Sequence, residues 1–186
     1  MQVGEFSPEE RALLLRLAHE SILSALEERE ISSEPPTAHL AEPRGVFTSL
    51  YLHDELRGCV GFVLPVKSVF GSVAETARAA AFEDSRFYPV RLEEASQLKI
   101  ELSILSPPRA IDPEAIEIGR HGLLVTMGEH RGLLLPQVPV EHKWDRVTFL
   151  NQTCIKAGLP RDAWQHGAKV EAFAAEVFGE KDSEHE

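Results

Sequence analysis

The chain has 186 residues, of which 43% are hydrophobic and 26% are charged, and its formal net charge is −11. This length suffices for one full hydrophobic core, or for a large lobe with a small insert, so we expect a single domain over residues 1–186. No apolar run approaches the length that spans a bilayer, and the first residues do not form a secretory signal, so we expect a cytoplasmic protein without a membrane span. An acidic chain without a basic stripe repels phosphate backbones, which argues against nucleic-acid binding.

The chain has only two cysteines, Cys59 and Cys154. Two are too few for a disulfide framework, and neither belongs to a pair with zinc-ligand spacing. No histidine pair has the H-x-x-x-H or H-E-x-x-H spacing of a helical metal site. We therefore expect two free thiols and no metal.

The first predicted element is a helix. Ser7 and Glu10 form a capping box, and Pro8 occupies the first helical position. Apolar residues at helical spacing then define one buried face: Leu13, Leu14, Leu17, Ala18, Ile22, Ala25 and Leu26. We expect this helix to dock on the rest of the fold.

A hairpin and a second helix follow a proline-containing loop over residues 32–43. Residues 45–51 read as a strand, and the turn at residues 53–55 leads into a strand that contains residues 56–62, so we expect an antiparallel hairpin. After Pro65, apolar residues recur at helical spacing from Val66 to Ala81. Residues 84–89 break this helix. Residues 98–105 return to a strand with Ile100, Leu102 and Ile104 on one face and Lys99, Glu101 and Ser103 on the other.

The remaining elements complete an α+β fold with a mainly antiparallel sheet flanked by helices. Residues 112–114 start a short helical turn, and residues 123–127 and 132–135 form a second hairpin. Asp145 caps a helix, and Trp144 before the cap and Phe149 after it have hydrophobic-staple spacing. Cys154 lies on the buried stripe of this helix as a core thiol. Residues 169–178 read as a final strand with Phe173, Ala175 and Val177 on one face, although their alanines leave a helix open.

The candidate site is the run Leu56-Arg57-Gly58-Cys59-Val60-Gly61. Strand alternation puts Arg57 and Cys59 on one face and sends Val60 toward a core. A cation beside a thiol favours the thiolate, and glycine lets a ligand or a second backbone approach closely. We therefore predict Cys59 as a catalytic residue and the other residues of the run as binding residues. The alternative is a buried, inert cysteine in a tightly packed glycine strand.

Three further residues are candidates for this site. If the strand of residues 98–105 lies beside the glycine strand, Glu101 meets Arg57 or Cys59, either as a catalytic group or in a simple ion pair with Arg57. A cysteine nucleophile needs a base, for which His121, near a glycine turn, is the leading histidine. Arg86 is a candidate for holding a phosphate or carboxylate, with a surface ion pair as the alternative.

Several blocks of the chain resemble one known family. Residues 56–61 are similar to the L-R-G-C-I-G hallmark of the AMMECR domain family, with Val60 in place of Ile. The match continues through residues 45–47, 84–89, 100–103, 134–138, 144–145, 149–150 and 156–159, and so covers nearly the whole chain. Ser85 stands where the family often has proline.

This resemblance implies an α+β fold with a β-sheet lobe and a smaller, mostly helical lobe that includes residues 65–97, with the hallmark near the cleft between them. The family's activity and cofactors are not established. The resemblance implies a pathway shared with a Memo-type protein and a radical S-adenosylmethionine protein, and this chain lacks the cysteine triplet of the radical enzyme. We expect an enzyme or substrate-handling subunit with Cys59 as the reactive centre. The alternative is a non-catalytic adaptor whose motif groove binds a protein partner.

Overall fold

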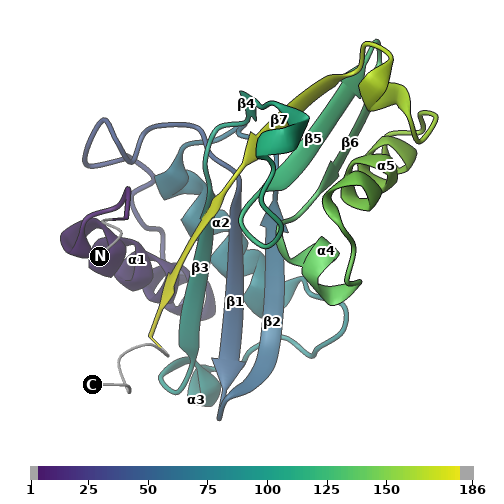
Figure 1. The fold of residues 1–186 in the computed structure, drawn as a ribbon. Helices are drawn as coiled ribbons and strands as arrows, with labels where there is room; N and C mark the ends of the chain where they lie inside the picture. Colours follow the sequence, from purple (N-terminus) through teal and green to yellow (C-terminus); the bar gives the residue numbers. More distant parts are fainter. Residues whose placement is uncertain (1–3, 181–186) are drawn as a thin grey trace. The chain divides into compact units, whose positions relative to one another are not determined.

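The computed structural model describes residues 4–180, which form two compact units. The first unit comprises the described parts of Met1–Leu105 and Glu176–Glu186, and the second comprises Ser106–Ala175. Each unit contains an antiparallel sheet with helices, which confirms the α+β fold class (Figure 1). Residues 65–97 lie in the first unit together with its sheet.

The first unit contains a four-stranded sheet in the order β2-β1-β3-β8. Its elements are α1 (Pro8–Leu26), β1 (Val46–Leu52), β2 (Glu55–Phe62), α2 (Val69–Phe82), α3 (Leu92–Ala95), β3 (Lys99–Leu105) and β8 (Ala175–Gly179). The expected capping box starts α1, since Glu10 N donates to Ser7 Oγ at 3.1 Å and Ser7 N donates to the Glu10 carboxylate at 2.9 Å. The second helix begins at Val69, capped by Ser68, so Val66 lies outside it and is exposed.

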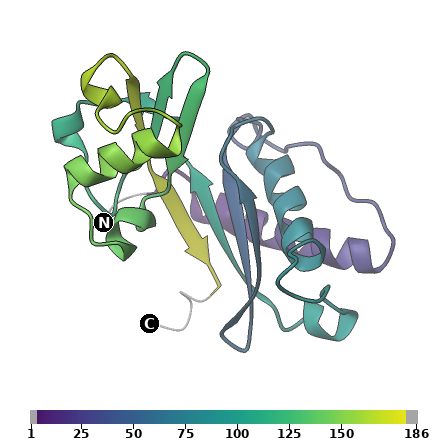
Figure 2. The same ribbon diagram turned by 90° about the vertical axis from the view of Figure 1, so that its right-hand side faces the viewer.

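Helices α1 and α2 lie on the same side of this sheet, as Figure 2 shows. The core between them and the sheet is built from alternate strand residues, because period two sends every second side chain to one face. Val46 and Leu50 of β1 and Ile100, Leu102 and Ile104 of β3 are all buried there. The opposite face of the sheet carries the candidate site.

The predicted hairpin is present, with β1 and β2 antiparallel. Its tight turn places His53 and Asp54 at positive φ, 50° and 65°. The register shifts between Leu50 and Tyr51, because Leu50 pairs with Gly58 and Tyr51 pairs with Leu56, so Arg57 is the extra residue of a β-bulge.

The second unit has its own four-stranded sheet, in the order β4-β7-β5-β6. Its elements are β4 (Arg109–Ala110), a short 3-10 turn (Pro113–Ala115), β5 (Gly122–Met127), β6 (His130–Leu134), α4 (Gln137–Glu141), α5 (Arg146–Lys156), a second 3-10 turn (Ala163–Gln165) and β7 (Lys169–Phe173). Helix α5 is capped by Asp145, and its Phe149 and Cys154 are fully buried. The assignment of Cys154 as a core thiol is therefore confirmed.

The final strand was predicted incorrectly. Residues 169–178 form two strands that belong to different sheets, β7 and β8, with Ala174 between them. Ala174 leaves the ladder because it exchanges two hydrogen bonds with Ser106 instead. The predicted grouping of Phe173 with Val177 on one face is also wrong, since Phe173 and Phe178 are buried whereas Val177 is 52% exposed.

No helix within residues 4–180 combines the length and the apolar character needed to cross a bilayer.

Candidate functional site

Cys59 lies opposite Ser49 on the face of the first sheet that α1 and α2 do not cover. The register pairs Ser49 with Cys59 of β2 on one side and with Glu101 of β3 on the other, so the three side chains form one row across the sheet. Ser49 Oγ donates a hydrogen bond to Cys59 Sγ at 3.3 Å. All three residues are half-buried. The row joins a thiol, a hydroxyl and a carboxylate.

Glu101 is not a direct neighbour of Cys59 or Arg57. Strand β1 lies between β2 and β3, so the backbones of Glu101 and Cys59 are separated by two strand spacings, about 9–10 Å. The simple Arg57–Glu101 ion pair is therefore wrong. Within residues 4–180 the Glu101 carboxylate makes no hydrogen bond or ion pair. Its charge still reaches Tyr51, whose pKa is raised by burial and then by Glu101 and Cys59.

Arg57 is bound to the segment that follows α2. Its Nε and Nη2 each lie 3.1 Å from a carboxylate oxygen of Glu94, and both side chains are 15% exposed. Its Nη1 donates to Tyr88 O at 2.7 Å, and its Nη2 also donates to Pro89 O at 3.4 Å. The Arg57 guanidinium correspondingly lowers the pKa of Glu94. Arg57 thus has a structural partner for its charge.

The glycines of residues 56–61 allow other parts of the protein to pack closely against the strand. A Cβ on Gly58 would lie 2.1 Å from Ala80 O, so this glycine lets the α2 backbone approach the sheet. A Cβ on Gly61 would lie 2.4 Å from the Phe47 ring. Val60 packs against the core as expected, and Leu56 is 38% exposed.

Asp84 connects Cys59 to Arg86. Its Oδ2 accepts a hydrogen bond from Cys59 N at 2.9 Å, and its carboxylate accepts three from Arg86, at 3.0 Å from Nε, 2.7 Å from Nη2 and 3.2 Å from the backbone N. Together these donors hold the pKa of Asp84 far below its usual 3.8, with the Arg86 contact contributing most. The expected surface ion pair of Arg86 is present, and its side chain remains 57% exposed.

The histidines have local partners. His121 belongs to the second unit, where it is half-buried and its Nδ1 accepts a hydrogen bond from Glu117 N at 3.0 Å. His53 contacts the Gln97 side chain at 3.1 Å, and the His142 ring stacks on Trp144. The role of His121 as a base stays a prediction.

Sequence reasoning missed Ser49, Asp84 and Glu94. Ser49 could have been found only from the hairpin register, which the bulge shifts. Asp84 and Glu94 flank the break between α2 and β3, and acidic residues there are usually solvated, so nothing in the sequence marked them as partners of Cys59 and Arg57.

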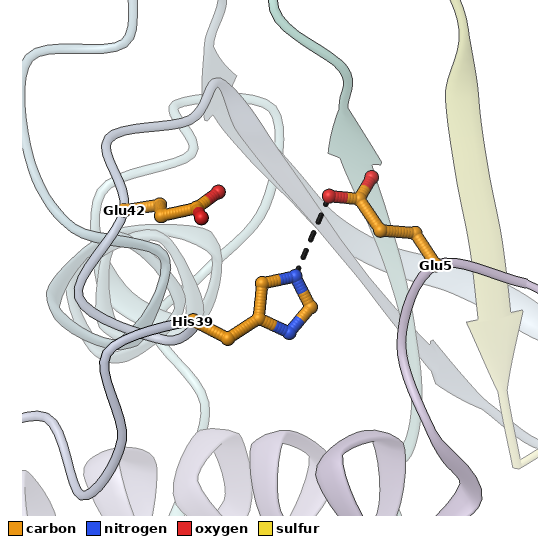
Figure 3. A group of neighbouring side chains, drawn as sticks. All are labelled: Glu5, His39 and Glu42. Carbon is orange, nitrogen blue, oxygen red and sulfur yellow. Dashed lines mark hydrogen bonds and ion pairs between the residues drawn. The ribbon is translucent and has the colours of Figure 1, made fainter.

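A second group of titratable side chains lies near the start of α1. Figure 3 shows the Glu5 carboxylate directed at the His39 ring, with Glu42 on the neighbouring loop. One ligand atom from each residue lies within 4.8 Å of the others, as in a cation site. Arg44, however, donates to both Glu5 and Glu42 and offsets part of their negative charge. We interpret the group as an ion-pair network, because a guanidinium opposes a bound cation.

The comparisons with known proteins assign the family. The AMMECR1 family model matches residues 15–178. The chain belongs to the AMMECR1 family. Among its AMMECR1 relatives, protein MK0488 of Methanopyrus kandleri is 46% identical, with 95% of this chain and 91% of the relative covered. A protein of Aquifex aeolicus is 42% identical, with 91% and 92% covered.

A solved structure supports the same assignment. The crystal structure of the uncharacterised protein PH0010 from Pyrococcus horikoshii has a TM-score of 0.68 and 42% identity to this chain, and 90% of each chain is covered. The family resemblance expected from the residue 56–61 motif is therefore confirmed, and the AMMECR1 family has no established activity.

Proposed function

We propose that this AMMECR1 chain is a cytoplasmic enzyme or substrate-handling subunit with Cys59 as its reactive centre. The observation that carries the proposal is the 3.3 Å hydrogen bond from Ser49 Oγ to Cys59 Sγ on a half-buried sheet face. A hydroxyl that donates to sulfur stabilises negative charge on it, and the thiolate is the nucleophilic form. Cys154, which is fully buried, has no comparable environment.

Each residue of the row has a role in this proposal. Cys59 supplies the sulfur nucleophile, and Ser49 orients the sulfur. The Glu101 carboxylate forms no hydrogen bond or ion pair with a described residue, so it is available to accept a proton from the substrate. His121 lies in the second unit, and its role as a base stays a prediction. The substrate would lie over residues 56–61.

The proposed pathway rests on the family resemblance alone. We place the chain in a modification pathway with a Memo-type protein and a radical S-adenosylmethionine protein. This predicts that the purified chain forms a complex with one of them, visible as a shift in size-exclusion chromatography. If neither protein from the same organism shifts at micromolar concentrations, the pathway assignment fails, whatever the chemistry of Cys59.

Thiol labelling tests the role of Cys59. Iodoacetamide near neutral pH should label Cys59 in the folded chain well before Cys154, as measured by mass spectrometry of the two cysteine peptides. Cys154 is the internal control, because burial raises its pKa and excludes the reagent. Ser49→Ala should slow the labelling of Cys59 and leave Cys154 unchanged. Equal, slow labelling of both cysteines would reject the reactive role.

A non-catalytic adaptor is the second candidate function. One observation in its favour is that the Arg57 guanidinium is already bound by Glu94 and two backbone carbonyls. Another is that Gly58 lets the backbone of α2 pack closely against the strand. On this alternative, the motif is mainly a packing element that shapes a partner-binding surface. Cys59→Ser should then preserve partner binding, and Cys59 should be alkylated as slowly as Cys154.

A further inference from the structure

A cavity of about 600 Å³ in the first unit adjoins the cysteine motif, and its walls are rich in positive charge. Three arginines line it, Arg57, Arg86 and Arg91, against one carboxylate, Glu94. The whole chain carries a net charge of −11, so this local excess of cations contrasts with its surroundings. Clusters of guanidinium groups in a concave site are the usual means of binding carboxylates and phosphates.

Two of the three guanidinium groups retain donors for a ligand. Arg57 is bound by Glu94 and two backbone carbonyls. Arg86 donates hydrogen bonds to Asp84 from Nε and Nη2, and its Nη1 has no hydrogen-bond partner among the described residues. The Arg91 guanidinium makes no hydrogen bond or ion pair within residues 4–180. Arg86 and Arg91 are therefore available to an anion.

Arg86 is held in position without a ligand. The Asp84 carboxylate that binds it is only 6% exposed and is itself fixed by the backbone of Cys59. The Arg86 guanidinium carbon also lies 5.4 Å from the centroid of the Phe87 ring. A guanidinium that is already ordered loses less conformational entropy when it binds, which favours affinity.

The cavity has room for more than an isolated anion. Its volume lies in the range of sites that take whole small molecules. Tyr88, on its wall, is 89% exposed, and its ring offers an apolar surface to the body of a ligand. Because Asp84 bonds both Arg86 and Cys59, an anion held at Arg86 lies close to the proposed reactive centre.

We propose that the cavity of Arg57, Arg86 and Arg91 binds a carboxylate or phosphate group of the substrate, with Arg86 and Arg91 as its direct ligands. This inference rests on the proposed function, and it specifies the substrate class as a small anionic molecule. Arg57 acts as a positioning residue, because its contacts with Glu94 and with the carbonyls of Tyr88 and Pro89 shape the cavity wall.

Titration of the full chain with inorganic phosphate and, separately, with acetate tests this site. At constant ionic strength, NMR amide shifts should saturate with at least one of the two anions, and the stronger binder identifies the group. Arg91→Gln should weaken that binding by about tenfold or more, since a hydrogen bond to a charged group is lost. The Arg91 guanidinium makes no hydrogen bond within the described residues, and the backbone hydrogen bond from Arg91 N to Glu94 is kept in the variant, so Arg91→Gln should fold normally. Arg16→Gln, on α1 and outside the cavity, is the matched control and should bind like the parent.

The proposal is overturned if neither anion saturates, or if Arg16→Gln weakens binding as much as Arg91→Gln. Cys59→Ser should bind phosphate or acetate with unchanged affinity, which separates this inference from the reactive role of the thiol. Saturable anion binding together with slow alkylation of Cys59 supports the cavity as an anion site and rejects Cys59 as a reactive centre. Rapid alkylation without anion binding overturns the cavity alone.

Discussion

The Asp84 carboxylate accepts a hydrogen bond from the backbone N–H of Cys59, with 2.9 Å between Oδ2 and N. Cys59 lies on β2, which is the edge strand of the first sheet, so no neighbouring strand pairs with this amide. The same carboxylate holds Arg86. The Asp84 side chain therefore provides an acceptor for a backbone N–H at the sheet edge. It also holds the segment after α2 beside Cys59.

Asp84→Ala should lower the free energy of unfolding by about 1–3 kcal/mol, because Cys59 N–H and Arg86 both lose their acceptor. Urea denaturation measures this change. The control is Glu83→Ala, an exposed neighbour with no side-chain hydrogen bond among the described residues, which should change stability by less than about 0.5 kcal/mol. Equal losses in the two variants would show that Asp84 is not the fastening residue.

The pH dependence of the Asp84 effect has a definite sign. The pKa of Asp84 is depressed in the folded state, so its contribution is fully present above the unfolded value, near 3.8, and is lost as the pH falls through the folded value. The difference between parent and Asp84→Ala should thus stay constant from about pH 5 to pH 8 and decrease only in strong acid.

Gly58→Ala should destabilise the first unit by about 2 kcal/mol or more, since the added methyl would meet the Ala80 carbonyl at 2.1 Å and α2 would have to move. The control is Gly71→Ala inside α2, where the nearest atom is Ser68 Oγ at 3.2 Å and alanine favours the helix. That variant should stay within about 1 kcal/mol of the parent. Thermal unfolding of both variants measures these changes in stability. If Gly58→Ala is as stable as the parent, Gly58 is not needed for packing against α2 and instead leaves room for a ligand.

Local patterns predicted most elements of this fold, but not the register that builds the site. Counting outward from the two-residue turn without a bulge pairs Cys59 with Thr48, which is buried in the core. The extra residue, Arg57, shifts the register by one, so that Cys59 pairs with Ser49 on the opposite face. A bulge depends on contacts made by its extra residue, here with Glu94, and those are tertiary.

Strand order was equally inaccessible from local patterns. The alternation in residues 98–105 correctly assigned Glu101 to a face, but it carried no information about which strand lies beside β3. The central position of β1 separates Glu101 from the motif. The division of residues 169–178 between two sheets was missed for the same reason, because both halves are extended and only their partners differ.

Trp144→Ala should lower the stability of the second unit by about 3 kcal/mol or more. Trp144 packs against the core that contains the fully buried Phe149, and its ring stacks on His142 with 4.7 Å between centroids. Val147→Ala, in the first turn of α5, is the control, since that side chain is 46% exposed and should change stability by less than about 1 kcal/mol. A Trp144→Ala chain with an unchanged melting temperature but impaired ligand binding would reverse this assignment.

The His39 network should make the stability of the first unit depend on pH near neutrality. His39 Nδ1 lies 2.7 Å from Glu10 Oε1 and Nε2 lies 3.4 Å from Glu5 Oε1, while the ring stacks on Phe6. The Glu10 contact, followed by the Glu5 contact, raises the pKa of His39 above its usual 6.5 against the opposing effect of burial. The nearby charge of Glu42 acts in the same direction.

A raised pKa in the folded state means that the contribution of His39 is fully present below the unfolded pKa, near 6.5, and is lost as the pH rises through the folded value. The parent should therefore exceed His39→Gln in stability by about 1 kcal/mol or less at about pH 6, and this difference should shrink by about pH 9. Urea denaturation at the two pH values measures it. His166→Gln, which alters an exposed histidine near Asp162, is the control and should track the parent at both. Parallel profiles for the parent and His39→Gln would exclude the network as the origin of the pH dependence.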